Sequence, residues 1–123
     1  MTILEALKGK TITAYELEKS GDYIVFTMND GSMVRLNAYG DCCSTTWIES
    51  LDAPDALLGT VKDVREIDMP DRGNIDGKRH KDVHIVQYYG IKITTNKGRC
   101  VIDYRNDSNG YYGGSLEVVK GAE

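Results

Sequence analysis

The densest group of side chains that could do chemistry lies in residues 104–114 of this 123-residue chain. Arg105 offers a planar fork of N–H donors that matches a phosphate, and Asn106 and Asn109 can donate to and accept from a base or ribose. Tyr112 adds a ring face for stacking, and the glycines of this run let backbone N–H groups approach an anion closely. The run therefore predicts a binding site for a small anionic ligand.

A purely structural interpretation of the same run stays open. Residues 108–110, Ser-Asn-Gly, are also typical of a simple turn, and Tyr111 and Tyr112 could fill the core. Arg105 could pair with Asp103, which lies two residues earlier on the same face of an expected strand. Composition alone does not choose between the two interpretations.

Three further candidates for ligand contact, Arg72, Tyr88 and Asn96, are proposed only from their positions. Arg72 belongs to residues 69–81, a polar stretch with two glycines that predicts a long surface loop able to close over a site. Tyr88 and Asn96 belong to the region of an expected hairpin. We include all three in the predicted site.

Metal binding and covalent catalysis find little support in the sequence. His80 and His84 stand four apart, but no glutamate follows His80 and the region reads as a loop that enters a strand, so zinc is not expected. Cys42 and Cys43 are adjacent and lack a CxxC spacing, which favours small buried residues. No phosphate loop, nucleophile elbow or dinucleotide fingerprint occurs. We therefore predict a protein that is not an enzyme and needs no cofactor.

Size and composition predict one domain, residues 1–123, that binds a ligand. With 41% hydrophobic and 28% charged residues the chain resembles an ordinary globular protein. It has neither the roughly 20 apolar residues of a membrane span nor a signal peptide, and its three cysteines fit a reducing cytoplasm. The net charge of −4 disfavours long nucleic acids and anionic membranes as partners.

Alternation of apolar and polar residues predicts two hairpins that hold the candidate residues. The turn signals are Asn-Asp-Gly at 29–31 and Asn-Lys-Gly at 96–98. Strands are expected at residues 15–18, 23–28, 32–37, 91–95 and 100–105. A short helix is expected at residues 52–58, with Pro54 near its start and Gly59 at its end. The predicted fold is mostly β (α+β), an antiparallel sheet or a two-layer β-sandwich with one or two short helices.

A second element, Gly40-Asp41-Cys42-Cys43 followed by Trp-Ile-Glu at 47–49, precedes the run 105–114 in the sequence. We expect Trp47, the only tryptophan, in the core, and Asp41 to cap a turn or orient Arg105. Together the two elements resemble the DCC and SNGYY elements of a family of small phage and prophage proteins. The chain is similar to the branch known as the Thoeris anti-defence sponges, first type, over roughly residues 30–119.

The resemblance implies that the protein binds the cyclic ADP-ribose isomer made by Thoeris sensors and sequesters it uncleaved, in the cytoplasm of the infected bacterial host. It implies a homodimer or higher homo-oligomer with ligand pockets between subunits, and second sites for cyclic oligonucleotides in some members. Matched to the SNGYY element, Arg105 would contact a phosphate, with Asn106, Asn109 and Tyr112 nearby.

Two alternatives remain from other functional classes. A small nucleotide hydrolase or lyase could use His84 or Asp103 as acid or base, and would alter its ligand. An inhibitor of a host defence protein could bind through Trp47 and exposed tyrosines, and would co-purify with that protein. Intact recovery of a small molecule distinguishes sequestration from both.

Overall fold

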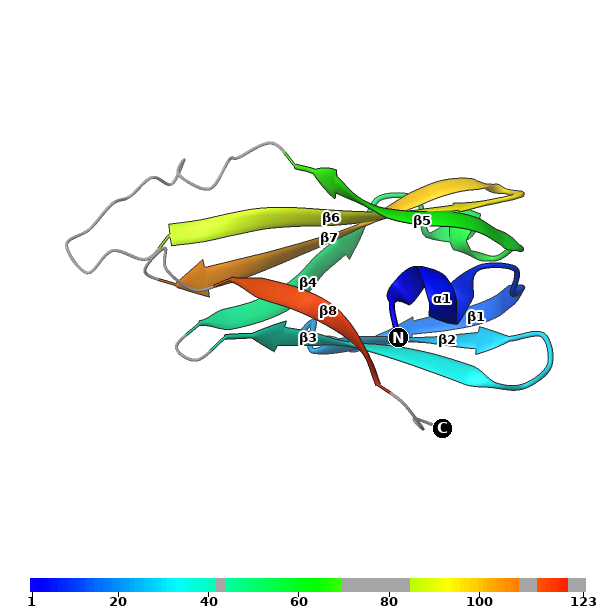
Figure 1. Cartoon of the computed structure of the whole chain (residues 1–123), viewed down its shortest axis with the longest axis horizontal. Coiled ribbons are helices and arrows are strands. Elements are labelled where there is room, and N and C mark those ends of the chain that lie inside the picture. Colours follow the sequence, from blue (N-terminus) through cyan, green and yellow to red (C-terminus); the bar gives the residue numbers. More distant parts are fainter. Residues whose placement is uncertain (42–43, 70–84, 109–112, 120–123) are drawn as a thin grey trace.

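Two four-stranded antiparallel sheets make up most of the computed structural model (Figure 1), which describes residues 1–41, 44–69, 85–108 and 113–119. The first sheet has the strand order β1-β2-β3-β8 and the second has the order β4-β7-β6-β5. The strands are β1 (Ile12–Leu17), β2 (Tyr23–Met28), β3 (Met33–Gly40), β4 (Thr45–Leu51), β5 (Val61–Asp68), β6 (Ile85–Thr95), β7 (Gly98–Ser108) and β8 (Gly114–Val119). The prediction of a mostly β fold with antiparallel sheets is confirmed.

Both expected hairpins are present, because their turns and alternation are local features of the sequence. Asp30 closes the first turn by accepting from the Ser32 N–H and hydroxyl at 2.9 and 2.7 Å. Gly31 adopts a φ of 89°, and Gly98 in the second turn adopts 133°, values that favour glycine. The second hairpin is longer than expected, since β6 and β7 pair continuously from Thr95 opposite Gly98 to Ile85 opposite Ser108.

The helical part differs from the prediction in two ways. The helix expected at residues 52–58 is a single 3₁₀ turn, η1 (Pro54–Leu57). A short α-helix, α1 (Ile3–Leu7), was not predicted, although its capping box is visible in the sequence: Thr2 accepts from the Glu5 N–H while Glu5 accepts from the Thr2 N–H. Five residues give too few turns for a helical period to show.

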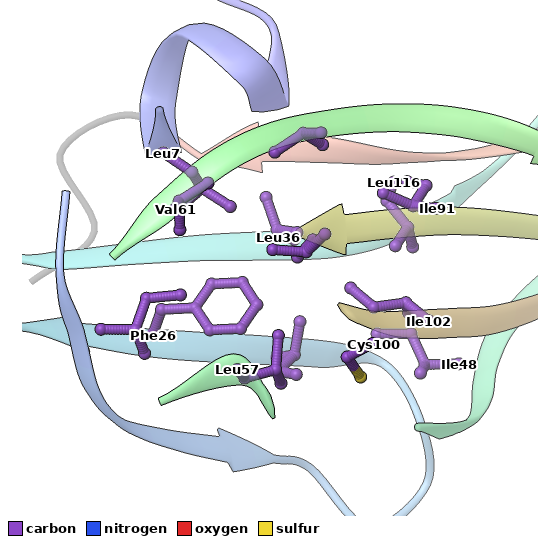
Figure 2. Close-up of a cluster of buried hydrophobic side chains, with 14 of the residues drawn as sticks. Leu7, Phe26, Leu36, Ile48, Leu57, Val61, Ile91, Cys100, Ile102 and Leu116 are labelled. Atoms are coloured by element: carbon purple, nitrogen blue, oxygen red, sulfur yellow. The ribbon is translucent and has the colours of Figure 1, made fainter. Parts of the chain in front are cut away.

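One buried apolar cluster draws side chains from both sheets and from the helices (Figure 2). Phe26 and Leu36 come from the first sheet, Ile102 from the second, Leu7 from α1 and Leu57 from η1; each is 0% exposed. Burial of each such side chain stabilises the fold by about 1.5–3 kcal/mol. The cluster fixes the ends of the strands on which the candidate site is built.

Candidate functional site

The two sequence elements of the predicted site meet at one end of the sheets. β4 follows the Asp41 element and β7 enters the C-terminal run, and the two strands are antiparallel neighbours. Thr46 lies opposite Asn106, and Trp47 lies opposite Arg105. The pairing therefore brings the described parts of both elements into direct contact.

Asn106 joins the elements through a buried polar cluster. Its side chain is 0% exposed, and Nδ2 donates to Ser44 Oγ at 2.9 Å and to Thr46 Oγ1 at 2.8 Å. The Ser44 hydroxyl in turn donates to the Asp41 carbonyl at 2.8 Å, and the Asp41 N–H donates to the Gly113 carbonyl at 3.0 Å. Asn106 Oδ1 has no hydrogen-bond partner among the described residues. The amide thus holds the two elements together and retains one unused acceptor.

Two paired glycines let this cluster pack closely against the first sheet. Gly40 on β3 lies opposite Gly114 on β8. A Cβ added to Gly114 would overlap Thr46 Oγ1 and lie 3.0 Å from Asn106 Nδ2, and one added to Gly40 would lie 2.8 Å from Ser44 Oγ. These glycines are therefore required by close approach rather than by an unusual backbone angle.

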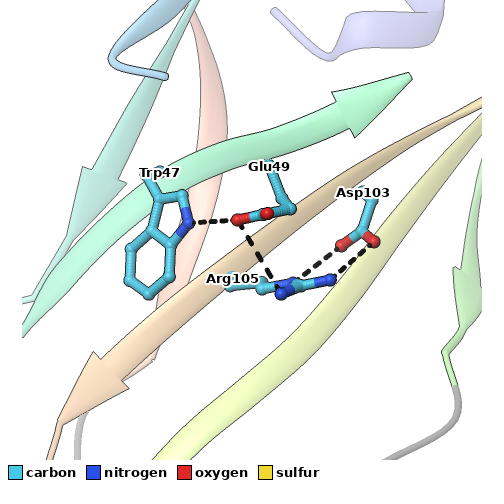
Figure 3. A network of polar contacts seen from close by, with 4 residues as sticks. All are labelled: Trp47, Glu49, Asp103 and Arg105. Atoms are coloured by element: carbon cyan, nitrogen blue, oxygen red, sulfur yellow. Dashed lines mark hydrogen bonds and ion pairs between the residues drawn. The ribbon is translucent and has the colours of Figure 1, made fainter. Parts of the chain in front are cut away.

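Arg105 lies at the centre of a polar network on the other face of the second sheet (Figure 3). Its Nε and Nη2 contact the Asp103 oxygens at 3.3 and 3.2 Å, and Nη1 lies 3.7 Å from Glu49 Oε1. Glu49 Oε1 also accepts from Trp47 Nε1 at 2.8 Å. The Arg105 guanidinium carbon lies 4.5 Å from the centroid of the Tyr88 ring. The pairing of Arg105 with Asp103, which is one part of the purely structural interpretation, is present; Tyr111 and Tyr112, which the same interpretation placed in the core, lie outside the described residues.

The electrostatics of this network decide how an anion could enter it. Burial lowers the pKa of Arg105, but the hydrogen bond and charge of Asp103 outweigh it and the pKa is raised, so the guanidinium stays charged. Two carboxylates face this one cation. Glu49 is the more exposed, at 42% against 14% for Asp103, and its contact is longer than a hydrogen bond. A phosphate would therefore replace Glu49 more easily than Asp103.

Sequence reasoning placed Trp47 wrongly and missed three members of the site. Thr46 and Ile48 are buried, so alternation along β4 turns Trp47 to the opposite face, where it is half-buried. Glu49 belongs to the Trp-Ile-Glu part of the second element, and Ser44 and Thr46 lie between its two parts, but none of the three was predicted as a site residue. An alternating apolar and polar pattern over residues 45–51 would have predicted the strand that holds Thr46 and Glu49, but a bulge between Ile48 and Ser50 interrupts that pattern.

The remaining predicted residues do not all gather at this end. Tyr88 does, opposite Arg105 on β6. Asn96 lies at the far turn of the hairpin, where its Oδ1 accepts from the Thr60 N–H at 2.8 Å. Arg105 lies seven positions along β7 from Gly98, which is beside that turn, so the two ends are roughly 23 Å apart. Arg72, Asn109 and Tyr112 lie outside the described residues, as do Cys42, Cys43, His80, His84 and most of the expected loop 69–81.

A family profile described as a domain of unknown function (DUF7448) matches residues 5–118. The chain belongs to the DUF7448 family. The matched region runs from before β1 to Val118 in β8 and includes both elements of the candidate site, so the site is part of the DUF7448 domain itself. No curated protein and no solved structure matches the chain.

Within the described part of this DUF7448 domain, no three histidine, cysteine or acidic side chains are grouped so that they could hold a metal ion. In the same residues, no helix is long and apolar enough to cross a membrane. The free thiol of Cys100 is buried, and burial raises its pKa. It lies in the apolar cluster and not beside Arg105 or Asn106.

Proposed function

We propose that this DUF7448 domain, folded as a two-layer β-sandwich, is a phage or prophage anti-defence protein that sequesters a cyclic ADP-ribose-type signalling nucleotide without degrading it. It would act in the cytoplasm of the infected bacterium and block Thoeris immunity. The observation that carries the proposal is the meeting of the two sequence elements, through which Asn106 contacts Ser44 and Thr46, 62 and 60 residues away.

Arg105 supports an anionic ligand of nucleotide type. Its guanidinium is charged and 21% exposed, and aromatic side chains lie beside it, Tyr88 by direct contact and Trp47 through Glu49. A planar cation beside an aromatic ring suits a ligand that carries both phosphate and bases. Charge-assisted hydrogen bonds to phosphate are among the strongest available, and nanomolar capture requires about −12 kcal/mol.

Sequestration also fits the chemistry better than hydrolysis. Asp103, the described candidate for an acid or base, accepts from two nitrogens of Arg105. Both oxygens of this carboxylate are thus engaged by a guanidinium, and neither is left free to approach a ligand. The proposal includes a homodimer or higher homo-oligomer and a second site for cyclic oligonucleotides; both of these parts rest on the family resemblance.

Calorimetry with purified cyclic ADP-ribose isomers tests the proposal, followed by heat release and mass spectrometry of the ligand. We expect tight one-step binding and recovery of the isomer with unchanged mass and retention time. Arg105→Ala should weaken binding at least a hundredfold. Arg35→Ala is the matched control, because Arg35 lies 3.9 Å from the Tyr23 ring centroid and donates to Asn37 on the first sheet.

Each alternative function has its own outcome in this experiment. A ligand recovered with its ring opened would show a hydrolase or lyase. No heat with any isomer, together with a host protein that co-purifies and is lost in Trp47→Ala, would show a protein-binding inhibitor. Equal binding by the Arg105→Ala and Arg35→Ala variants would refute the assignment of Arg105.

A further inference from the structure

A pocket of about 480 Å³ opens beside the end of β5, next to the Arg105 network. Its lining residues are Glu66, Ile67, Met69, Tyr88, Tyr89, Gly90 and Tyr104. Gly90 makes room for the Met69 side chain, because a Cβ there would lie 2.6 Å from Met69 Sδ and 2.9 Å from Met69 Cγ. The volume lies within the range of ligand pockets in proteins.

Two tyrosine rings give the pocket flat apolar walls. Tyr89 and Tyr104 are cross-strand neighbours on β6 and β7, and their rings stack with centroids 5.0 Å apart and planes inclined by 17°. The Tyr89 hydroxyl is occupied by Gln87 Oε1 at 3.3 Å. Met69 adds a polarisable thioether, which packs well against aromatic rings. Such a lining favours a planar aromatic ligand over a sugar or an aliphatic chain.

Tyr104 and Glu66 give the same pocket one donor and one acceptor. The Tyr104 ring stacks on that of Tyr89, and its phenol O–H can donate a hydrogen bond. Burial, and secondarily the Glu66 carboxylate, raises the pKa of Tyr104 to about 12, so the phenol is a donor at neutral pH. Glu66 is exposed and contributes only acceptor oxygens. A ring nitrogen beside an amino group, as in adenine, matches this pair.

We propose that this pocket binds the aminopurine base of the ligand, with Tyr104 donating to a ring nitrogen and Glu66 accepting from the exocyclic amino group. The inference rests on the proposed function, because it adds a base site to the phosphate site at Arg105. Tyr88 connects the two, since it lines the pocket and also contacts the Arg105 guanidinium. Tyr89 and Tyr104 alternate with Tyr88 and Arg105 and so face the opposite side of the second sheet. Because the pairing of β5 with β6 ends at Tyr89, a nucleotide would join the two sites around the edge of β6 at Tyr88.

Adenosine and inosine are the probes, because inosine has a carbonyl oxygen at position 6 in place of the amino group and carries a proton on the neighbouring ring nitrogen N1. Binding is followed by NMR of protein with labelled tyrosine rings. We expect the Tyr89 and Tyr104 signals to shift with adenosine while Tyr23 stays unchanged. Inosine should bind about tenfold more weakly, since its carbonyl faces the Glu66 carboxylate and a charge-assisted hydrogen bond is lost.

Two conservative variants test the polar pair, each with a matched control. Tyr104→Phe removes only the hydroxyl and should weaken adenosine binding about fivefold, whereas Tyr23→Phe should not. Glu66→Gln should abolish the preference for adenosine over inosine, whereas Asp63→Asn, an acidic residue of β5 outside the pocket, should keep it.

Failure of this inference can be distinguished from failure of the proposed function. If the cyclic ADP-ribose isomers bind and depend on Arg105, but Tyr104→Phe and Glu66→Gln bind them as the unaltered protein does, the base site is wrong and sequestration stands. If adenosine shifts Tyr89 and Tyr104 while no isomer binds, the pocket stands and sequestration is wrong. Tyrosine signals unmoved by adenosine would overturn the pocket assignment.

Discussion

Replacing Asp103 by asparagine separates the two possible roles of Arg105, internal ion pair and phosphate site. Asp103 occupies Nε and Nη2 of Arg105 at 3.3 and 3.2 Å, so a phosphate that replaced Glu49 at Nη1 would still lie close to the Asp103 carboxylate and be repelled by its charge. Asparagine has nearly the same shape but no charge, and its oxygen can still accept from one nitrogen. The substitution should therefore weaken the fold slightly and strengthen phosphate binding.

The magnitudes follow from the exposure and charge of the network. Asp103 and Arg105 side chains are 14% and 21% exposed, so their pair lies between a surface and a buried one, and its loss should lower the free energy of unfolding by about 1–2 kcal/mol. The local charge changes from −1 (Asp103, Glu49 and Arg105) to 0. Removal of a like charge about 5 Å from a phosphate is worth about 1–3 kcal/mol at an effective dielectric constant of 20–60, or roughly tenfold or more in affinity.

Calorimetry with the cyclic ADP-ribose isomer at about 0.15 M salt, together with urea unfolding, measures both effects. Asp63→Asn is the control, because Asp63 pairs with Arg65 two residues later on β5 at 2.8 Å, with side chains 36% and 64% exposed. We expect Asp63→Asn to leave both affinity and stability unchanged within the error of the two measurements. Weaker ligand binding by Asp103→Asn would refute the idea that Arg105 is shared between Asp103 and phosphate.

Three further predictions concern the fold. Gly21→Ala should lower the free energy of unfolding by about 2–4 kcal/mol in urea melts, because φ of Gly21 is 85° and the new Cβ would overlap the β4 backbone. Gly31→Ala is the control: φ is 89° but no atom lies within 4 Å of the added Cβ, so its free energy of unfolding should fall by only about 1 kcal/mol. The hydrogen bond from the Ser20 hydroxyl lowers the pKa of Glu18 from 4.5. The ionised Glu18 therefore stabilises the fold above pH 4.5, and this stability is lost as the pH falls through the folded-state pKa. The thermal midpoint of Glu18→Gln should depend less on pH over this range than that of the unaltered protein. Ultraviolet titration should find a tyrosine that ionises at about pH 12 and is absent from Tyr104→Phe. Because the folded-state pKa of Tyr104 is raised from 10, the stability that its neutral phenol contributes is present below pH 10 and is lost between pH 10 and 12.

The hairpins could be predicted because everything that determines them is contained in a dozen adjacent residues. In β2 the buried positions alternate without exception, and in the following turn Asp30 and Gly31 supply the carboxylate and the backbone angle that the reversal needs. β3 was expected to end at residue 37 but continues to Gly40. Its continuation depends on β8, with which Tyr39 and Gly40 pair, and no local signal reports that pairing.

β4, β5 and β8 were not predicted, and their common feature is dependence on distant partners. β4 and β5 contain bulges, between Ile48 and Ser50 and between Val61 and Asp63, which shift the alternation by one residue. β8 is short and begins at Gly114, which must be a glycine because Thr46 on β4 leaves no room for a Cβ there. The hydrophobic pattern of a single segment contains no information on the distant strand with which that segment pairs.

The candidate site shows the same division between residue type and environment. Arg105 and Asp103 are two apart, so their pairing could be weighed from sequence alone, and the structure contains it. Asn106 was expected to face the ligand, yet it is 0% exposed and its side-chain Nδ2 donates hydrogen bonds to Ser44 and Thr46. Only its Oδ1 remains for another group. An asparagine so placed acts first by fixing the two elements that flank Arg105, because an amide that lost either hydroxyl would leave a buried donor unpaired beside the strand pair that positions the guanidinium.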